Sequence, residues 1–303
     1  NFQMNKFLIQ MDEFVTWIRQ NEREFFDEVM KIYCVIPLCF LGGQLVVTAP
    51  YGKFQWNKSR LSGKFGWLLM ECFALITFIY SFFVNDLFST IYTDSAYTTT
   101  QLILCSLWII HYTNRTIIYT YRAPNISPMH ILIMSSGIFY NIMNGYTVAR
   151  WISIFGRDNY FYDEDGRDIY KSPRFILGVF VFLVGMTINI HHDNILFSLR
   201  SNLDKSTKSE SIKVVTNTSS PSSKYLIPNG GLFNYIACPN YFGEIVEWAG
   251  FVIATWYSFP AVMFLMTTLA NLIPRARSNL KWYRVKFGDA YPKNRKAIIP
   301  FVL

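Results

Sequence analysis

The sequence predicts an all-α integral membrane protein with seven transmembrane helices. Three observations support this fold class: the composition, the recurrence of long apolar runs, and the alternation of charge between them. Of the 303 residues, 51% are hydrophobic, 18% are aromatic and only 16% are charged. A soluble domain carries about 25% charged residues. The mean hydropathy of +0.20 is modest for a membrane protein, so long polar loops must connect the spans.

Seven segments are apolar and long enough to cross about 30 Å of hydrocarbon. Several of them contain Gly, Pro, Asn or Tyr, which favours helices that pack on one another. A tight turn near Pro260 separates the last two segments. The predicted spans are 29–49, 65–84, 101–121, 129–149, 174–198, 236–256 and 257–273.

The loops between these segments alternate in charge. Loop 50–64 contains four basic residues and no acid, whereas 85–100 contains two acids and no base. The first 28 residues hold six acidic and three basic groups, and the tail from Pro274 holds eight basic residues and one acid. Because basic loops stay on the cytosolic side, we expect a lumenal N-terminus and a cytosolic C-terminus, which requires an odd number of spans. The net charge of +8 then needs no nucleic-acid partner.

The predicted organisation is a lumenal segment 1–28, a membrane domain 29–273 and a basic cytosolic tail 274–303. Residues 1–28 lack the basic start and apolar core of a signal peptide. The Ser/Thr/Lys-rich part of 201–224 indicates a flexible cytosolic insertion. Five scattered cysteines are expected to be reduced. We expect the glycosylation sequons to stay unmodified; they begin at Asn57, Asn114, Asn125 and Asn217.

Polar residues recur inside the spans at helical spacing. Glu71 is a lone carboxyl group in FGWLLMECFALITFIYSFFV, and a charge in lipid costs roughly 2.5–3.5 kcal/mol. Each of three further stripes shares one helix face: Asn189, Asp193 and Arg200; Tyr112, Arg115 and Tyr119; and Asn240, Glu244 and Glu247. Interhelical hydrogen bonds are one explanation for such residues. Together with Glu71 and a basic rim, they favour a wet internal site.

Other kinds of site are less well supported by the sequence. The four histidines include one adjacent pair, which is too few for a di-iron oxygenase, so we predict no metal. No G-x-G-x-x-G motif follows a strand, so a Rossmann site is absent. A phosphorylated cofactor would therefore need basic residues at the cytosolic helix ends, where arginine suits phosphate oxygens. The arginines placed for this are Arg200, Arg275, Arg277 and Arg295.

Three stretches together resemble the steroid 5α-reductase family, including its plant branch: NIHHDNILFSLR, IPNGGLFNYIACPNYFGEIVEWAGFVIATW and KWYRVKFGDAYPKNRKAIIPFVL. The resemblance is dense from Pro173 to Leu303 and thinner upstream, where WLLMECF and HYTNRT are similar to the family's paired catalytic segments. It implies a seven-span reductase that uses NADPH to reduce the C4–C5 double bond of a Δ4-3-oxo steroid, with cofactor and lipid substrate enclosed between helices. It also implies the endoplasmic reticulum membrane for a eukaryotic source, or the plasma membrane for a bacterial one.

The resemblance also implies roles for individual residues. Glu71 and Tyr112 would hydrogen-bond the steroid's C3 carbonyl, and Trp67 and Phe139 are candidates for the apolar steroid pocket. The sequence departs from the family at Met70, Phe197 and Leu226, where a glutamine and two arginines are common. The predicted cofactor-binding residues are Arg115, Asn189, Asp193, Arg200, Tyr235, Asn240, Glu244, Arg275, Tyr283 and Arg295.

The chemistry accounts for a carboxyl group inside a span. Hydride delivered to C5 pushes negative charge onto the C3 oxygen, and donors placed there lower the barrier. A carboxyl group donates only when protonated, and burial favours that form. Three alternatives stay open: a reductase of an enoyl thioester or a polyprenol, a membrane methyltransferase that binds S-adenosylmethionine, and a non-enzymatic lipid-binding or channel protein. NADPH consumption and product analysis separate them.

Overall fold

In the computed structural model, the described residues are 20–46, 60–83, 97–213 and 225–303, with a few positions before residue 20. Several sequence predictions therefore fall outside the described residues. These are most of the N-terminal segment, the basic stretch 50–59 with its sequon at Asn57, the acidic stretch 84–96, and 214–224 with its sequon at Asn217.

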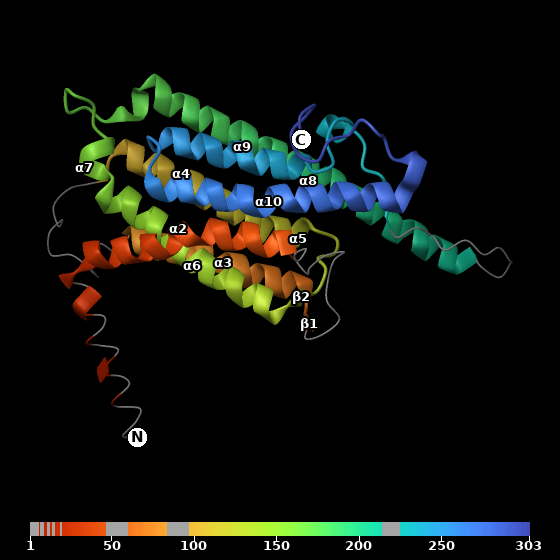
Figure 1. Cartoon of the computed structure of the whole chain (residues 1–303), viewed down its shortest axis with the longest axis horizontal. Coiled ribbons are helices and arrows are strands. Elements are labelled where there is room, and N and C mark those ends of the chain that lie inside the picture. Colours follow the sequence, from red (N-terminus) through yellow and green to blue (C-terminus); the bar gives the residue numbers. More distant parts are fainter. Residues whose placement is uncertain are drawn as a thin grey trace.

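Long helices lie side by side along the long axis of the molecule (Figure 1). A helix coincides with each of the seven predicted segments, and α4 continues through a π-helical turn, Asn114–Ile118, into α5. By length and composition, α3, α8 and α10 are long and apolar enough to cross a membrane, as judged over the described residues. The helices are α2 (Glu22–Val46), α3 (Gly63–Phe83), α4 (Thr99–Thr113), α5 (Tyr119–Arg122), α6 (Ile131–Arg150), α7 (Arg157–Tyr160), α8 (Pro173–Lys213), α9 (Pro239–Ala254) and α10 (Phe259–Phe287).

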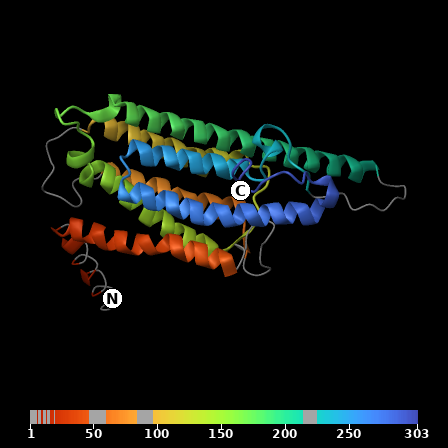
Figure 2. The same ribbon diagram turned by 45° about the horizontal axis from the view of Figure 1, so that its top comes forward.

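The connections gather at the two ends of the bundle. The start of α2, α7 and the α9–α10 turn lie at one end, and the C-terminus and the short strands lie toward the other (Figures 1 and 2). The strands β1 (Arg60–Leu61) and β2 (Met129–His130) pair antiparallel.

Aromatic side chains fill the centre of the bundle. Trp108 of α4 is fully buried and stacks on Phe78 of α3 with ring centroids 4.8 Å apart. Trp248 of α9 packs on Phe264 of α10 at 4.2 Å. Large apolar side chains such as Leu38 are exposed on the outer faces instead. This distribution suits a protein whose outside contacts lipid.

Helices α8 and α9 approach one another closely through glycine. A Cβ atom at Gly185 would lie 2.1 Å from the backbone nitrogen of Glu247, and one at Gly243 would lie 2.4 Å from that of Asn189. Small residues at such contacts let helix backbones meet in a membrane. The close approach sets the polar residues of the two helices side by side.

Two helices are longer than the sequence analysis predicts. Helix α8 continues to Lys213, into the segment expected to be a flexible insertion, because no glycine or proline follows Gly185 before Pro221. Helix α10 contains Pro274 and ends at Phe287, directly before Gly288, which has a φ of 54°. The first part of the predicted basic tail is therefore a continuation of the last helix.

Candidate functional site

The Glu71 carboxyl group lies in the interior of the bundle. The residue is buried on α3, with only 8% of its surface exposed. Arg115, Glu244 and His111 lie close enough to interact with it electrostatically. The Asn141 side chain on α6 contacts the carboxyl group and donates to the backbone oxygen of Met70 at 2.8 Å. Glu71 thus faces polar groups from three other helical segments.

Arg115 lies at the centre of these polar groups. It lies in the π-helical turn after α4, a local widening often found at functional sites. Its guanidinium group lies 3.6 Å from a Glu244 carboxylate oxygen and 4.8 Å from the centroid of the Trp67 ring. The Trp67 indole N–H donates to the backbone oxygen of Arg115 at 3.2 Å. The stripes of α4 and α9 therefore meet, as predicted.

Hydrogen bonds between the polar stripe of α8 and the polar stripe of α9 join the two helices. The Asn189 amide donates to the backbone oxygen of Asn240 at 3.0 Å. The Asn240 amide in turn donates to the Asp193 carboxylate at 3.0 Å. Asn189 and Asp193 are each 5% exposed. These two residues and the half-buried Asn240 form one network beside Arg115, which interacts electrostatically with Asp193.

Tyr112 is buried at the end of α4. Its ring packs on Trp108 with centroids 4.7 Å apart and lies edge-on to His111 at 4.9 Å. Its hydroxyl oxygen accepts a hydrogen bond of 3.4 Å from the Asn144 amide. Glu71 interacts with the hydroxyl group electrostatically. The two predicted catalytic residues therefore share one interior region.

A buried pair next to Tyr112 was missed in the sequence analysis. The His111 Nδ1 atom lies 2.7 Å from a carboxylate oxygen of Glu247, and neither side chain is more than 7% exposed. Glu247 belongs to the α9 stripe, but its partner lies 136 positions away in the sequence. Periodicity gives the face that a residue occupies and not the residue that it meets, so only the carboxylate could be anticipated.

The predicted cofactor residues near the C-terminus form a second group. Arg295 is 3% exposed and donates to the backbone oxygen of Pro228 at 2.8 Å and to the Asn229 side chain at 2.6 Å. The Tyr283 ring stacks on Tyr291 at 5.3 Å. Arg295 thus ties the C-terminal segment to the loop that precedes α9.

The remaining predicted cofactor residues lie near the same end. Arg200 is exposed and donates to the backbone oxygen of Asn125 at 3.3 Å. Arg275 lies over the Tyr241 ring at 5.8 Å. Tyr235 is half-exposed and packs against Phe301 at 5.4 Å. Among them, Arg200 lies close enough to Asp193 to interact with it electrostatically.

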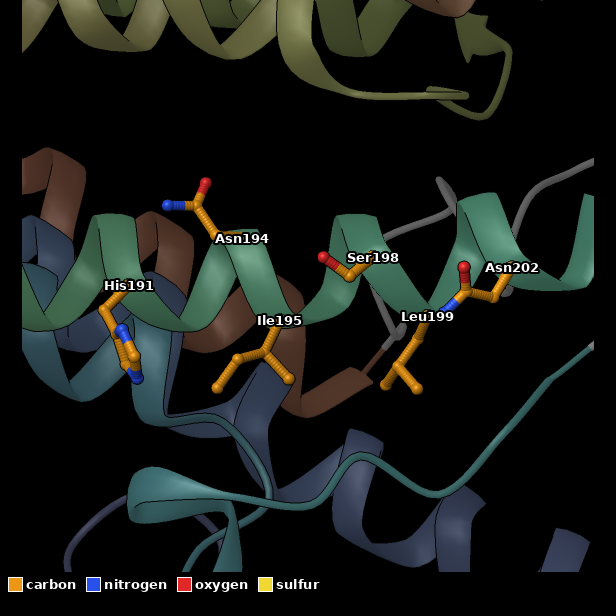
Figure 3. A pocket seen from close by; sticks show the side chains of 6 residues that line it. All are labelled: His191, Asn194, Ile195, Ser198, Leu199 and Asn202. Carbon is orange, nitrogen blue, oxygen red and sulfur yellow. The ribbon is translucent and has the colours of Figure 1, made fainter.

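Two pockets flank α8 and meet at Asn194. One lies between α8 and the α4–α5 segment and includes Asp193, Tyr119 and Phe197. Figure 3 shows the other, where His191, Ile195 and Leu199 project from one side of α8 and Asn194 from the opposite side. Its lining is completed by Ser198 and Asn202. Amide and hydroxyl side chains thus lie along α8 on the C-terminal side of the buried network.

Phe139 does not belong to the polar interior. It lies on the outer side of α6 with 60% of its surface exposed, and its place in a steroid pocket stays a prediction. Trp67, the other candidate for that pocket, is 8% exposed and borders Arg115. An aromatic residue in a span can face lipid or protein, and the sequence around Phe139 does not distinguish the two.

Of the paired histidines, His192 has a structural role. Nδ1 of His192 lies 2.7 Å from the Ile188 backbone oxygen, and its Nε2 atom accepts from the Leu232 backbone N–H at 3.0 Å. The ring therefore holds the turn at Gly231, where φ is 52° and a Cβ would meet it at 2.7 Å. Among the described residues, no group of histidine, cysteine and acidic side chains could hold a metal ion.

The fold and these contacts define a helical membrane protein with a buried polar site. Its sequence matches the family model described as 3-oxo-5-alpha-steroid 4-dehydrogenase over residues 127–303. The chain therefore belongs to the steroid 5α-reductase family, a family of oxidoreductases, as the sequence motifs predict.

The similarity extends over most of the chain in individual relatives. It is 34% identical over 290 residues to Steroid 5-alpha-reductase DET2 of Gossypium hirsutum, covering 91% of this chain and 98% of that protein. It is 36% identical over 294 residues to the protein of the same name in Arabidopsis thaliana, covering 92% and 99%. For 3-oxo-5-alpha-steroid 4-dehydrogenase 1 of Rattus norvegicus the identity is 33% over 262 residues, covering 85% and 87%.

Proposed function

We propose that this protein reduces the C4–C5 double bond of a Δ4-3-oxo steroid with NADPH and releases the 5α-dihydro steroid. The observation that carries the proposal is the burial of Glu71 and Tyr112 in one region, on neighbouring helices of a chain whose relatives are steroid 5α-reductases. A carboxyl group and a phenol are two donors that can meet at one carbonyl oxygen.

The residues around α8 fit a nicotinamide dinucleotide. Such a cofactor needs hydrogen-bond donors for its phosphates and polar side chains for its ribose hydroxyl groups. It also needs polar partners for the carboxamide of its nicotinamide ring. Asn194, Ser198 and Asn202 line the open pocket, and Arg115 reaches the buried network. One carboxylate oxygen of Glu244 is buried 3.6 Å from Arg115 and accepts no hydrogen bond from any described residue, so it remains an acceptor that a cofactor donor could use. The residues that would hold NADPH are Arg115, Asn189, Asp193, Arg200, Tyr235, Asn240, Glu244, Arg275, Tyr283 and Arg295.

When bound, NADPH supplies the hydride. The chain's own residues bind the steroid, orient it and stabilise the charge that develops on its C3 oxygen. Glu71, held as the neutral acid, and Tyr112 donate hydrogen bonds to that oxygen, and each such donor is worth about 10²–10³ in rate. Trp67 and the aromatic core beside Tyr112 exclude water, which strengthens these hydrogen bonds.

The membrane arrangement is part of the proposal. The helices at the seven predicted segments would cross the bilayer and enclose the cofactor and the steroid between them. The N-terminus would be lumenal and the C-terminus cytosolic, in the membrane of the endoplasmic reticulum of a eukaryotic cell. The described C-terminal residues lie toward the same end of the bundle as the short strands (Figure 1).

The test is conversion of a Δ4-3-oxo steroid by the purified protein with NADPH, with the product assigned by mass spectrometry. Glu71→Gln replaces the carboxyl O–H with a weaker amide donor and should lower kcat by about 10²–10³. Glu164→Gln is the control, because Glu164 is exposed in the loop that follows α7.

Each outcome has a distinct meaning. A 5α-dihydro product made by the wild type and lost in Glu71→Gln supports the substrate and the role of the carboxyl group. An active Glu71→Gln variant would show that Glu71 is structural. A wild type that binds NADPH but reduces no steroid would shift the substrate to an enoyl thioester or a polyprenol.

A further inference from the structure

A chain of hydrogen bonds runs from α2 through α6 to Tyr112. The Tyr33 hydroxyl group on α2 donates to the Asn144 side-chain oxygen on α6 at 2.7 Å. The Asn144 amide nitrogen donates to the Tyr112 hydroxyl oxygen at 3.4 Å. Tyr33 and Asn144 are fully buried, and Tyr112 is 4% exposed. Three helices distant in sequence therefore meet at this one set of polar atoms.

The number of hydroxyl protons determines which group donates in each of these hydrogen bonds. A tyrosine hydroxyl group has one proton, and that of Tyr33 is committed to the Asn144 oxygen. The Tyr140 hydroxyl oxygen lies 3.3 Å from that of Tyr33, so the proton between them comes from Tyr140. The Tyr112 oxygen accepts from Asn144, which leaves the Tyr112 proton for another acceptor.

We propose that Tyr33 and Asn144 are positioning residues that aim the Tyr112 proton at the carbonyl oxygen of the substrate. The inference rests on the proposed function, because it assigns Tyr112 as a donor to the steroid. If the Asn144 amide were reversed, its oxygen would face Tyr112 and take up the proton that the substrate needs. The donor at Tyr33 holds the amide in the productive orientation. Asn144 also polarises the Tyr112 O–H bond by donating to its oxygen.

Tyr33→Phe tests the proposal with the smallest change. It removes the hydroxyl group and leaves the ring in place, so the Asn144 oxygen loses its donor and turns toward Tyr112. We expect kcat to fall about tenfold or more, within the 10²–10³ that a whole oxyanion donor contributes, while KM for the steroid changes less than about threefold. Tyr140→Phe, one step further along the chain, should show a smaller fall in kcat.

The matched control is Tyr146→Phe on the same helix as Asn144. The Tyr146 hydroxyl group is buried and makes no hydrogen bond to any described residue. Its loss should therefore leave kcat and KM at the wild-type values. Thermal unfolding of every variant in the same detergent shows whether a lower kcat reflects a smaller folded fraction.

A double-mutant cycle with Tyr112→Phe separates positioning from a general structural effect. If Tyr33 acts through Tyr112, adding Tyr33→Phe to Tyr112→Phe should lower kcat no further. Full additivity in the cycle would overturn the proposal, and so would a wild-type kcat in Tyr33→Phe. Both results leave the proposed function intact, whereas a wild type without steroid reductase activity would remove both.

Discussion

Replacing Gly243 with alanine should separate α8 from α9. The new Cβ would lie 2.4 Å from the Asn189 backbone nitrogen and 2.8 Å from the Gly185 backbone oxygen. Ordinary contact begins at 3.4 Å, so the helices must move apart by about 1 Å, since backbone atoms cannot rotate away. Such overpacking costs about 1–3 kcal/mol, against which alanine returns up to about 1 kcal/mol of helix propensity.

Gly42→Ala is the matched control for this prediction. Gly42 is also helical, and a Cβ there meets no atom within 4 Å of the described structure. It should gain up to about 1 kcal/mol of helix propensity and lose nothing in packing. We therefore expect Gly243→Ala to be less stable than Gly42→Ala by about 1–3 kcal/mol.

The assay is thermal unfolding of the purified protein in one detergent, followed by tryptophan fluorescence. NADPH affinity should weaken in Gly243→Ala, because the Asn240 bonds to Asn189 and Asp193 cross the same interface. Equal unfolding temperatures for Gly243→Ala and Gly42→Ala would refute the reasoning that the close backbone approach holds these bonds together.

Three further predictions concern residues outside the proposed catalytic pair. Arg174→Ala should lower the free energy of unfolding by about 1–2 kcal/mol, because the Arg174 guanidinium lies over the rings of Trp256 and Tyr257 in the α9–α10 turn, both of which have a left-handed backbone conformation. Thermal unfolding measures this loss, with Arg167→Ala at an exposed arginine as the control. Glu22→Gln should lower the free energy of unfolding by about 3 kcal/mol, because it removes the carboxylate that pairs with the fully buried Arg150 on α6. Glu24→Gln, at an exposed position, should leave the stability unchanged in the same assay. Burial raises the pKa of Tyr291 above its ordinary value of 10.0, so its contribution to stability is complete below pH 10 and is lost as the pH rises through the folded-state pKa. Tyr291→Phe should therefore lose less stability than the wild type between pH 10 and 11, and an identical decline in both proteins would contradict this.

The positions of the helices could be predicted from the sequence because each apolar run is long. It predicted their ends less well, since α8 and α10 continue into polar residues that hydropathy excludes. The periodicity of Asn189, Asp193 and Asn240 gave the correct faces, and the structure joins all three. The outward position of Phe139 could not be predicted, because hydrophobicity is the same on the lipid and protein sides of a span.

Pairs of buried charges were also beyond the sequence. Arg150 and Glu22 lie 128 positions apart, yet the arginine is fully buried against that carboxylate and donates to the Ser81 backbone oxygen at 2.9 Å. Each charge alone looks like a loop residue near a span. Their pairing depends on how α2 packs on α6, which no single segment of the sequence encodes.

The same pairs explain why Glu71 is the carboxyl group best suited to donate. Glu22, Glu244 and Glu247 each have a basic partner within 4.0 Å, which commits them as acceptors. Among the described residues, Glu71 has no such ion pair: Arg115, its cationic neighbour, lies against Glu244. An acid that is buried without a counterion keeps its proton at the lowest cost. Asp193, which is also buried and has no ion pair among the described residues, accepts a hydrogen bond from the Asn240 amide instead. In the proposed reaction, these contacts leave Glu71 as the buried carboxyl group best placed to donate to a carbonyl oxygen.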